Sequence, residues 1–216
     1  MSIKKEDIDL FLNNAMQFYI KSNLPYHNFK HIQDMIDIAE SYDCKLTLGQ
    51  FLAILYHDCI YIPGAKDNEE QSIKSMYQQI NIVSMSFYKR NEVAIAEQII
   101  FDTKNHIPTI KESELIIDLD LVSLGYEPKI FSECRNAIYD EYKKVYVNKS
   151  DRDYDFEILF HEGTVDFGNK MLTRNSIYCT DLFKDIYEKK ATTNLFKMVN
   201  ESLTMLKIYQ ETSKWE

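Results

Sequence analysis

Apolar residues recur every three or four positions through most of the chain, and this spacing predicts α-helices. Only five glycines and four prolines interrupt the 216 residues, so the stretches between turns are long. N-cap residues, capping boxes and prolines mark the expected helix ends. The expected helices cover about residues 5–20, 28–39, 47–58, 91–105, 113–124 and 128–145, with others beginning near residues 68, 150 and 180. The predicted fold class is therefore all-α.

The segment from Ser113 to Leu124 is the one place where the pattern allows two structures. Its β-branched and apolar residues could form a strand, but their spacing also fits a buried helix, and we favour the helix. No repeat, low-complexity tract or linker divides the chain. We therefore expect a single domain that covers residues 1–216.

Composition and charge narrow the classes of function. Hydrophobic residues make up 45% and charged residues 27%, as is typical of globular proteins. No apolar run approaches the ~20 residues that cross a bilayer, and no secretory signal opens the chain, so we expect a cytoplasmic protein without a membrane partner. The net charge of -9 argues against binding to duplex nucleic acid. It leaves a small phosphorylated substrate open, because a bound divalent cation can reverse the local potential.

Histidine and aspartate supply the candidate chemistry. His27 and His31 are spaced to share one face of a predicted helix, and His57 directly precedes Asp58. Imidazole and carboxylate groups together suit divalent transition metals, and a site with open positions can activate water. Two further aspartates, at positions 118 and 120, lie in an apolar segment where an unpaired charge would be costly to bury. A metal ion would explain one of them.

The order of His31, His57-Asp58 and Asp120 resembles the H…HD…D pattern of the HD superfamily of metal-dependent phosphohydrolases. The string from Tyr26 to His31 also looks like the YHNxxH signature of the cyclic-nucleotide phosphodiesterases, which are HD-type enzymes. Over nearly the whole chain the closer resemblance is to a bacterial group of predicted HD phosphohydrolases. Five ordered motifs of that group, YHNxxHI, HD, NE, TxxH and DxDLxxLG, match Tyr26–Ile32, His57-Asp58, Asn68-Glu69, Thr103–His106 and Asp118–Gly125.

This resemblance implies an HD-type helical bundle with the metal site between core helices. The motif core would cover residues of about 26–125, and C-terminal helices over about 128–212 would complete the bundle. The implied metal ligands are His31, His57, Asp58 and Asp120. Asp58 could bridge two ions. Asp120 is preferred to Asp118 because it holds the second place of the DxD motif, which leaves Asp118 as a supporting carboxylate.

The resemblance also implies roles around the metal. His27 corresponds to the histidine that protonates the leaving oxygen in the phosphodiesterases, although the positive end of a helix dipole would favour its neutral form. A carboxylate neighbour, Glu69 or Asp67, could offset the dipole or orient the attacking water. The candidates for contact with substrate phosphate or base are His106, Arg152, Tyr26 and Lys104. His106 could instead complete a second metal site.

The function implied is hydrolysis of a phosphate ester or anhydride in a small molecule, with a nucleotide as the leading substrate. One or two divalent ions, drawn from Mn²⁺, Mg²⁺, Fe²⁺, Zn²⁺ and Co²⁺, would lower the pKa of a bound water toward ~7, and the resulting metal-bound hydroxide would attack phosphorus. A phosphodiesterase acting on cyclic nucleotides or on cyclic or linear dinucleotides is the second hypothesis. A metal-stabilised nucleotide-binding module without turnover is the third.

Overall fold

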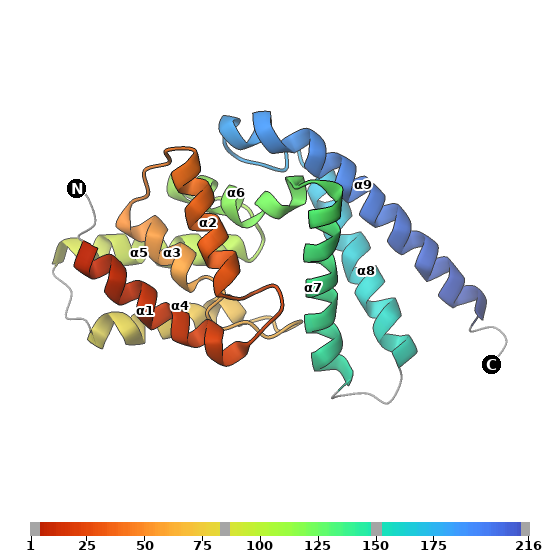
Figure 1. Ribbon diagram of the computed structural model, residues 1–216, viewed down its shortest axis with the longest axis horizontal. Helices are drawn as coiled ribbons and strands as arrows, with labels where there is room; N and C mark the ends of the chain where they lie inside the picture. The colour runs from red at the N-terminus through yellow and green to blue at the C-terminus, as the bar shows by residue number, and fades with distance from the viewer. Residues whose placement is uncertain (1–4, 83–86, 148–152, 213–216) are drawn as a thin grey trace. The chain divides into compact units, whose positions relative to one another are not determined.

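The computed structural model describes residues 5–82, 87–147 and 153–212. Every regular element in these ranges is a helix, which confirms the all-α prediction (Figure 1). The elements in chain order are α1 (Lys5–Ser22), α2 (Phe29–Ser41), α3 (Leu48–Tyr56), α4 (Asn68–Ile82), α5 (Phe87–Thr103), α6 (Lys111–Asp120), η1 (Val122–Gly125), α7 (Pro128–Val147), α8 (Asp153–Leu172) and α9 (Asp181–Thr212).

The chain forms two compact units, Met1–Asp120 and Leu121–Glu216, and each is described by itself. The expectation of a single domain stays a prediction. All but one of the candidate site residues belong to the first unit. The exception, Arg152, lies outside the described residues.

Helix α3 forms the core of the first unit. It packs against α1, α2, α4, α5 and α6, and all nine of its residues are buried (Figure 1). A helix surrounded in this way has no solvated face, which explains why its residues are apolar on every side except at Gln50, in its first turn. Its start is the expected capping box, in which the Thr47 side chain accepts from the Gln50 backbone and the Gln50 side chain accepts from the Thr47 backbone.

Helices α3 and α5 approach closely where α3 carries a glycine. A Cβ built on Gly49 would lie 2.7 Å from the carbonyl oxygen of Glu92 and 2.9 Å from Cγ2 of Ile95. The backbone N–H of Gly49 also donates to Oε2 of Glu92 over 2.7 Å. The absence of a side chain at Gly49 therefore sets the distance between the two helices.

We expect Gly49→Ala to lower the free energy of unfolding by about 1–3 kcal/mol, because the added methyl group overpacks this contact. Gly163→Ala is the matched control. Gly163 lies within α8, where an added Cβ would meet nothing within 4 Å, so alanine should stabilise the protein by about 0.5–1 kcal/mol through its higher helix propensity. Denaturant titration of both variants checks the signs. Equal effects would contradict the close-approach argument.

Several helix ends differ from the prediction. Helix α5 begins four residues earlier than expected and ends at Thr103, two residues earlier. The segment expected as one helix over 113–124 is helical rather than extended, as favoured, but it divides into α6 and the short 3₁₀ helix η1. The division falls directly after Asp120, so this aspartate stands at the C-terminal end of α6.

In the second unit, α9 packs against α8 and η1. Asn194 on α9 donates through Nδ2 to the carbonyl oxygens of Leu124 and Tyr126 over 2.8 and 2.9 Å, and this holds the end of η1. None of the described helices is both long enough and apolar enough to cross a membrane.

Candidate metal centre

The first histidine of the centre is positioned by the start of α2. Asn28 is the N-cap of this helix, and its Oδ1 accepts from the backbone N–H groups of Lys30 and His31. Its Nδ2 donates in the other direction, to the carbonyl oxygens of Leu24 and Pro25. Asn28 thereby fixes both the path of the incoming chain and the first turn of α2, from which the buried His31 projects.

The end of α3 provides the second histidine and the first carboxylate. His57 is buried, and its Nδ1 lies 3.0 Å from the carbonyl oxygen of Ile54. A proton on Nδ1 donates to that carbonyl and leaves the lone pair of Nε2 directed into the site. Nε2 of His57 lies 3.1 Å from Oδ2 of the next residue, Asp58.

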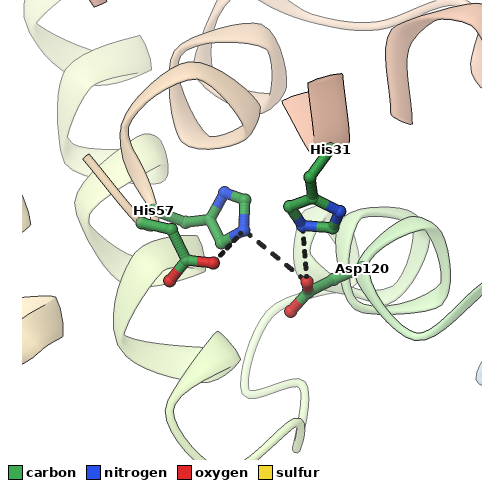
Figure 2. A group of neighbouring side chains, drawn as sticks. His31, His57 and Asp120 are labelled. Carbon is green, nitrogen blue, oxygen red and sulfur yellow. Dashed lines mark ion pairs between the residues drawn. The ribbon is translucent and has the colours of Figure 1, made fainter. Parts of the chain in front are cut away.

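The second carboxylate comes from the end of α6. Oδ1 of Asp120 lies 3.2 Å from Nε2 of His31 and 3.6 Å from Nε2 of His57, and Figure 2 shows the three side chains pointing toward one another. Asp118, two positions earlier on the same helix, is completely buried, whereas Asp120 keeps 14% of its side-chain surface exposed. The clustered aspartate is therefore the one selected from the DxD motif.

The four side chains His31, His57, Asp58 and Asp120 form a group that could hold a metal ion. Each offers one ligand atom, and these atoms all lie within 4.8 Å of one another. Ligands about 2.1 Å from a common ion stand roughly 3.0–3.4 Å apart at octahedral or tetrahedral angles. Two of the distances between nitrogen and carboxylate oxygen, 3.1 and 3.2 Å, lie within that range, and the third, 3.6 Å, is slightly longer.

The hydrogen bonding of the two imidazoles also fits a metal ion. Nε2 of His31 and Nε2 of His57 are buried and have no hydrogen-bond partner of good geometry. A buried polar atom left in this way costs roughly 1–3 kcal/mol. Coordination of a cation by both nitrogens would remove that cost, so the donor set of two imidazoles and two carboxylates fits a divalent transition metal.

The two carboxylates of the centre favour a positive charge beside them. Burial alone would raise the pKa of Asp120, but contacts with His106, His31 and His57 outweigh it and hold that pKa well below the ordinary value. Burial likewise raises the pKa of Asp58, and the neighbouring His57 outweighs it and lowers that pKa. For His57 both effects have the opposite sign: burial lowers its pKa, and the carboxylates of Asp58 and Asp120 outweigh burial and raise that pKa well above the ordinary value. Both carboxylates are therefore ionised at neutral pH, and a cation would satisfy the same demand as a proton on His57.

His27 lies beside the centre but not on α2. The prediction that it shares a helix face with His31 is wrong, because Asn28 caps α2 and the helix begins at Phe29. The ring of His27 stacks on Tyr61 with centroids 3.7 Å apart and planes 18° apart. Its Nε2 lies 4.0 Å from Oδ2 of Asp58, so Asp58 is a carboxylate close to this imidazole.

The other residues expected near His27 have different neighbours in the structure. Oε2 of Glu69 lies 3.4 Å from the Lys104 ammonium group, and Oδ2 of Asp67 accepts from the side chain of Gln71 on α4. Lys104 also donates to both carboxylate oxygens of Glu70, over 2.7 and 2.9 Å. As a phosphate ligand, Lys104 would have to leave these carboxylates.

Tyr26 borders the centre through its ring. Its centroid lies 4.9 Å from that of His27 and 5.3 Å from that of His31. The substrate role predicted for Tyr26 stays a prediction, and so do the catalytic roles predicted for Glu69 and Asp67.

The loop that follows Asp58 is anchored by two polar side chains of α4. Asn68 accepts from the backbone N–H of Ile62 and donates to its carbonyl oxygen, both over 3.0 Å. Ser72 makes the corresponding pair of bonds with Ile60. These bonds fix the loop that contains Tyr61, and they give the asparagine of the NE motif a structural role.

His106 joins the centre from the loop between α5 and α6. Its Nε2 lies 3.3 Å from Oδ2 of Asp120, the carboxylate oxygen that does not face His31 and His57. The sequence therefore identified a residue next to the candidate metal ligands. It did not identify Asp102, which organises the same loop, although a carboxylate directly after the apolar run Ile99–Phe101 was an available signal.

The Asp102 side chain is buried among hydrogen-bond donors. It accepts from the Ser113 hydroxyl over 2.5 Å, from the Thr109 backbone N–H over 2.7 Å and from Nε2 of Gln98 over 3.0 Å. Burial raises the pKa of Asp102, but these hydrogen bonds outweigh burial and lower it.

A carboxylate with a depressed folded-state pKa stabilises the protein above the unfolded pKa of about 3.9, and this stabilisation is lost as pH falls through the folded value. We expect Asp102→Asn to lower the free energy of unfolding at pH 7 by on the order of 2 kcal/mol. The difference between wild type and variant should shrink below about pH 4. Denaturant titrations at several pH values measure it, and a difference independent of pH would contradict the assignment.

Comparison of the chain with protein-family models, with curated proteins and with solved structures found no match.

Proposed function

We propose that this protein is a metal-dependent phosphohydrolase of the HD superfamily that cleaves a phosphate ester or anhydride in a small molecule. The observation that carries the proposal is the convergence of His31, His57, Asp58 and Asp120, which follow the H…HD…D order and leave two buried imidazole nitrogens without hydrogen-bond partners. A fold or a cluster alone does not establish an activity, so the proposal also depends on the chemistry of the residues around the cluster.

A divalent cation at this centre would polarise a phosphoryl oxygen and lower the pKa of a water molecule toward about 7. The protein's own contribution begins with His57, whose Nδ1 is held by the Ile54 carbonyl so that Nε2 points into the site. Asp58 and Asp120 supply two negative charges that would hold the cation.

His27 is the proposed general acid. Asp58, 4.0 Å from its Nε2, supplies the negative charge that can hold a protonated imidazole, and the stacked ring of Tyr61 limits its rotation. From this position His27 would transfer a proton to the leaving oxygen as the bond to phosphorus breaks. In this proposal Asp58 therefore has two roles: it binds the metal ion, and its negative charge stabilises the protonated form of His27.

A nucleotide is the proposed substrate among small phosphate compounds. Tyr26 and Tyr61 both contact His27 beside the centre, and aromatic rings at such a position favour a substrate that carries a base. The cation would offset the acidic centre when the phosphate approaches.

The test is a substrate panel with the full chain. The protein is stripped with chelator and reloaded separately with Mn²⁺, Mg²⁺, Fe²⁺, Zn²⁺ or Co²⁺. Each form is assayed on nucleoside mono-, di- and triphosphates, cyclic nucleotides, and cyclic and linear dinucleotides. We expect metal-dependent release of phosphate or pyrophosphate from a mononucleotide, with one ¹⁸O atom incorporated from labelled water.

Cleavage of cyclic nucleotides or dinucleotides alone would instead support a phosphodiesterase, which the YHNxxH string of Tyr26–His31 favours. Metal and nucleotide binding without turnover on any substrate would contradict the proposal and support a binding module.

A further inference from the structure

The backbone at His106 adopts a conformation that residues other than glycine rarely adopt. Its φ is +52°, in the left-handed region, which costs an L-residue roughly 1–2 kcal/mol. Two backbone hydrogen bonds of 3.2 Å hold the turn, from His106 N–H to the Thr103 carbonyl and from Ile107 N–H to the Asp102 carbonyl. The loop is thus held in a shape that directs this imidazole at Asp120.

Asp102 binds this loop at both of its ends. Its backbone carbonyl accepts a hydrogen bond from the N–H of Ile107, the residue after His106. Its side chain accepts from the backbone N–H and the hydroxyl of Thr109, over 2.7 and 2.8 Å. The same carboxylate accepts from Ser113 in the first turn of α6. We call Asp102, Thr109 and Ser113 the Asp102 clamp. The clamp joins the end of α5, which precedes His106, to the start of α6, which ends at Asp120.

The two oxygens of Asp120 have different surroundings. Oδ1 faces the metal-ligand nitrogens of His31 and His57, whereas Oδ2 lies 3.3 Å from Nε2 of His106. A ring with its proton on Nε2 can donate to Oδ2 and so fix the rotation of the carboxylate. Carboxylates that bind metals are commonly oriented by such a donor, and its loss typically weakens metal binding by about 10–100-fold.

We infer that His106 is a positioning residue that orients Asp120 for the metal, and that the Asp102 clamp holds His106 in place. The inference rests on the proposed metal centre but not on any particular substrate. It differs from the roles that the sequence suggests for His106, contact with phosphate or ligation of a second ion. The geometry favours orientation because the imidazole faces a carboxylate oxygen that is turned away from the other two histidines.

The first experiment compares His106→Ala, His106→Gln and Ile107→Ala in full-length, metal-free protein titrated with Mn²⁺ or Zn²⁺ against a chromophoric chelator. Glutamine carries an N–H donor at about the reach of Nε2, and the half-exposed side chain of Ile107 provides the loop control. We expect His106→Ala to raise the Kd by about 10–100-fold, His106→Gln to recover most of the loss, and Ile107→Ala to bind as wild type. The number of ions bound at saturation should be the same in all four proteins.

Three results would overturn this role. If His106→Ala loses an ion at saturation, or if His106→Gln binds as weakly as His106→Ala, His106 is a direct ligand. If His106→Ala binds as tightly as wild type, it has no role in metal binding. Circular dichroism of the metal-free proteins separates these outcomes from loss of fold.

The second experiment tests the clamp through a double-mutant cycle. Asp102→Asn should weaken metal binding in the wild-type background but not further in the His106→Ala background, since its effect passes through His106. Equal losses in both backgrounds would overturn the role of the clamp. If Asp102→Asn does not fold, Thr109→Val replaces it in the cycle, because valine removes the hydroxyl and keeps the backbone N–H. Turnover is measured in parallel: wild-type protein that binds metal without turnover contradicts the proposed function alone, and wild-type protein that binds no metal contradicts both.

Discussion

Asp120→Ala should abolish metal binding in the micromolar range. The substitution removes the carboxylate whose Oδ1 lies 3.2 and 3.6 Å from the two histidine nitrogens, and it leaves the other three candidate ligands unchanged. Loss of an orienting residue alone costs about 10–100-fold in metal affinity, so loss of a ligand should exceed about 100-fold. Elemental analysis after dialysis and chelator competition measure the effect. Turnover, where wild type shows it, should be lost together with the metal.

Asp118→Asn is the matched control, because it changes the other aspartate of the same DxD motif. Asp118 is fully buried and lies outside the group of four side chains within ligand distance of one another. This variant should keep its metal, although replacement of a buried carboxyl group can lower its melting temperature. Metal loss in Asp118→Asn with retention in Asp120→Ala would reverse the assignment. Wild-type protein that binds no divalent ion under any condition would remove the centre altogether.

Local sequence signals were sufficient for the starts of α2 and α3, the helices next to three of the four candidate ligands. Asn28 and Thr47 were readable as N-caps because a capping side chain bonds to backbone groups only two or three residues away. The end of α6 was not readable, since no glycine or proline stops it at Asp120. The segment between α5 and α6 was predicted least well, because its shape depends on Asp102 bonding to residues seven and eleven positions further along the chain.

The composition of the candidate site was more predictable than its internal contacts. The order of the motifs predicted that four residues form one site, and the structure brings these side chains together: His31, His57, Asp58 and Asp120. The neighbours of His27 were not predictable in this way. Sequence proximity to the HD pair suggested Glu69 or Asp67, yet Asp58 is the carboxylate near its ring, across 31 positions of sequence that loop back through α3. Such pairings follow from the packing of α2 on α3, which periodicity does not encode.

His27→Ala should separate proton transfer from metal binding. If His27 protonates the leaving oxygen, the variant should retain metal affinity within a few-fold of wild type, since the four ligands are intact. Its kcat should fall by about 10²–10⁴-fold on nucleotides, whose leaving groups need a proton. The loss should be far smaller on p-nitrophenyl phosphate, whose leaving group departs as a stable anion.

Tyr61→Phe is the control for this variant, because it keeps the ring that stacks 3.7 Å from His27 and removes only the hydroxyl. It should retain most of the wild-type kcat on both kinds of substrate. An equal loss in His27→Ala for good and poor leaving groups would show that His27 acts before bond cleavage, for instance in binding the substrate. The ratio of the two losses is therefore the decisive quantity: only an acid that acts as the bond to phosphorus breaks makes the loss depend on the leaving group.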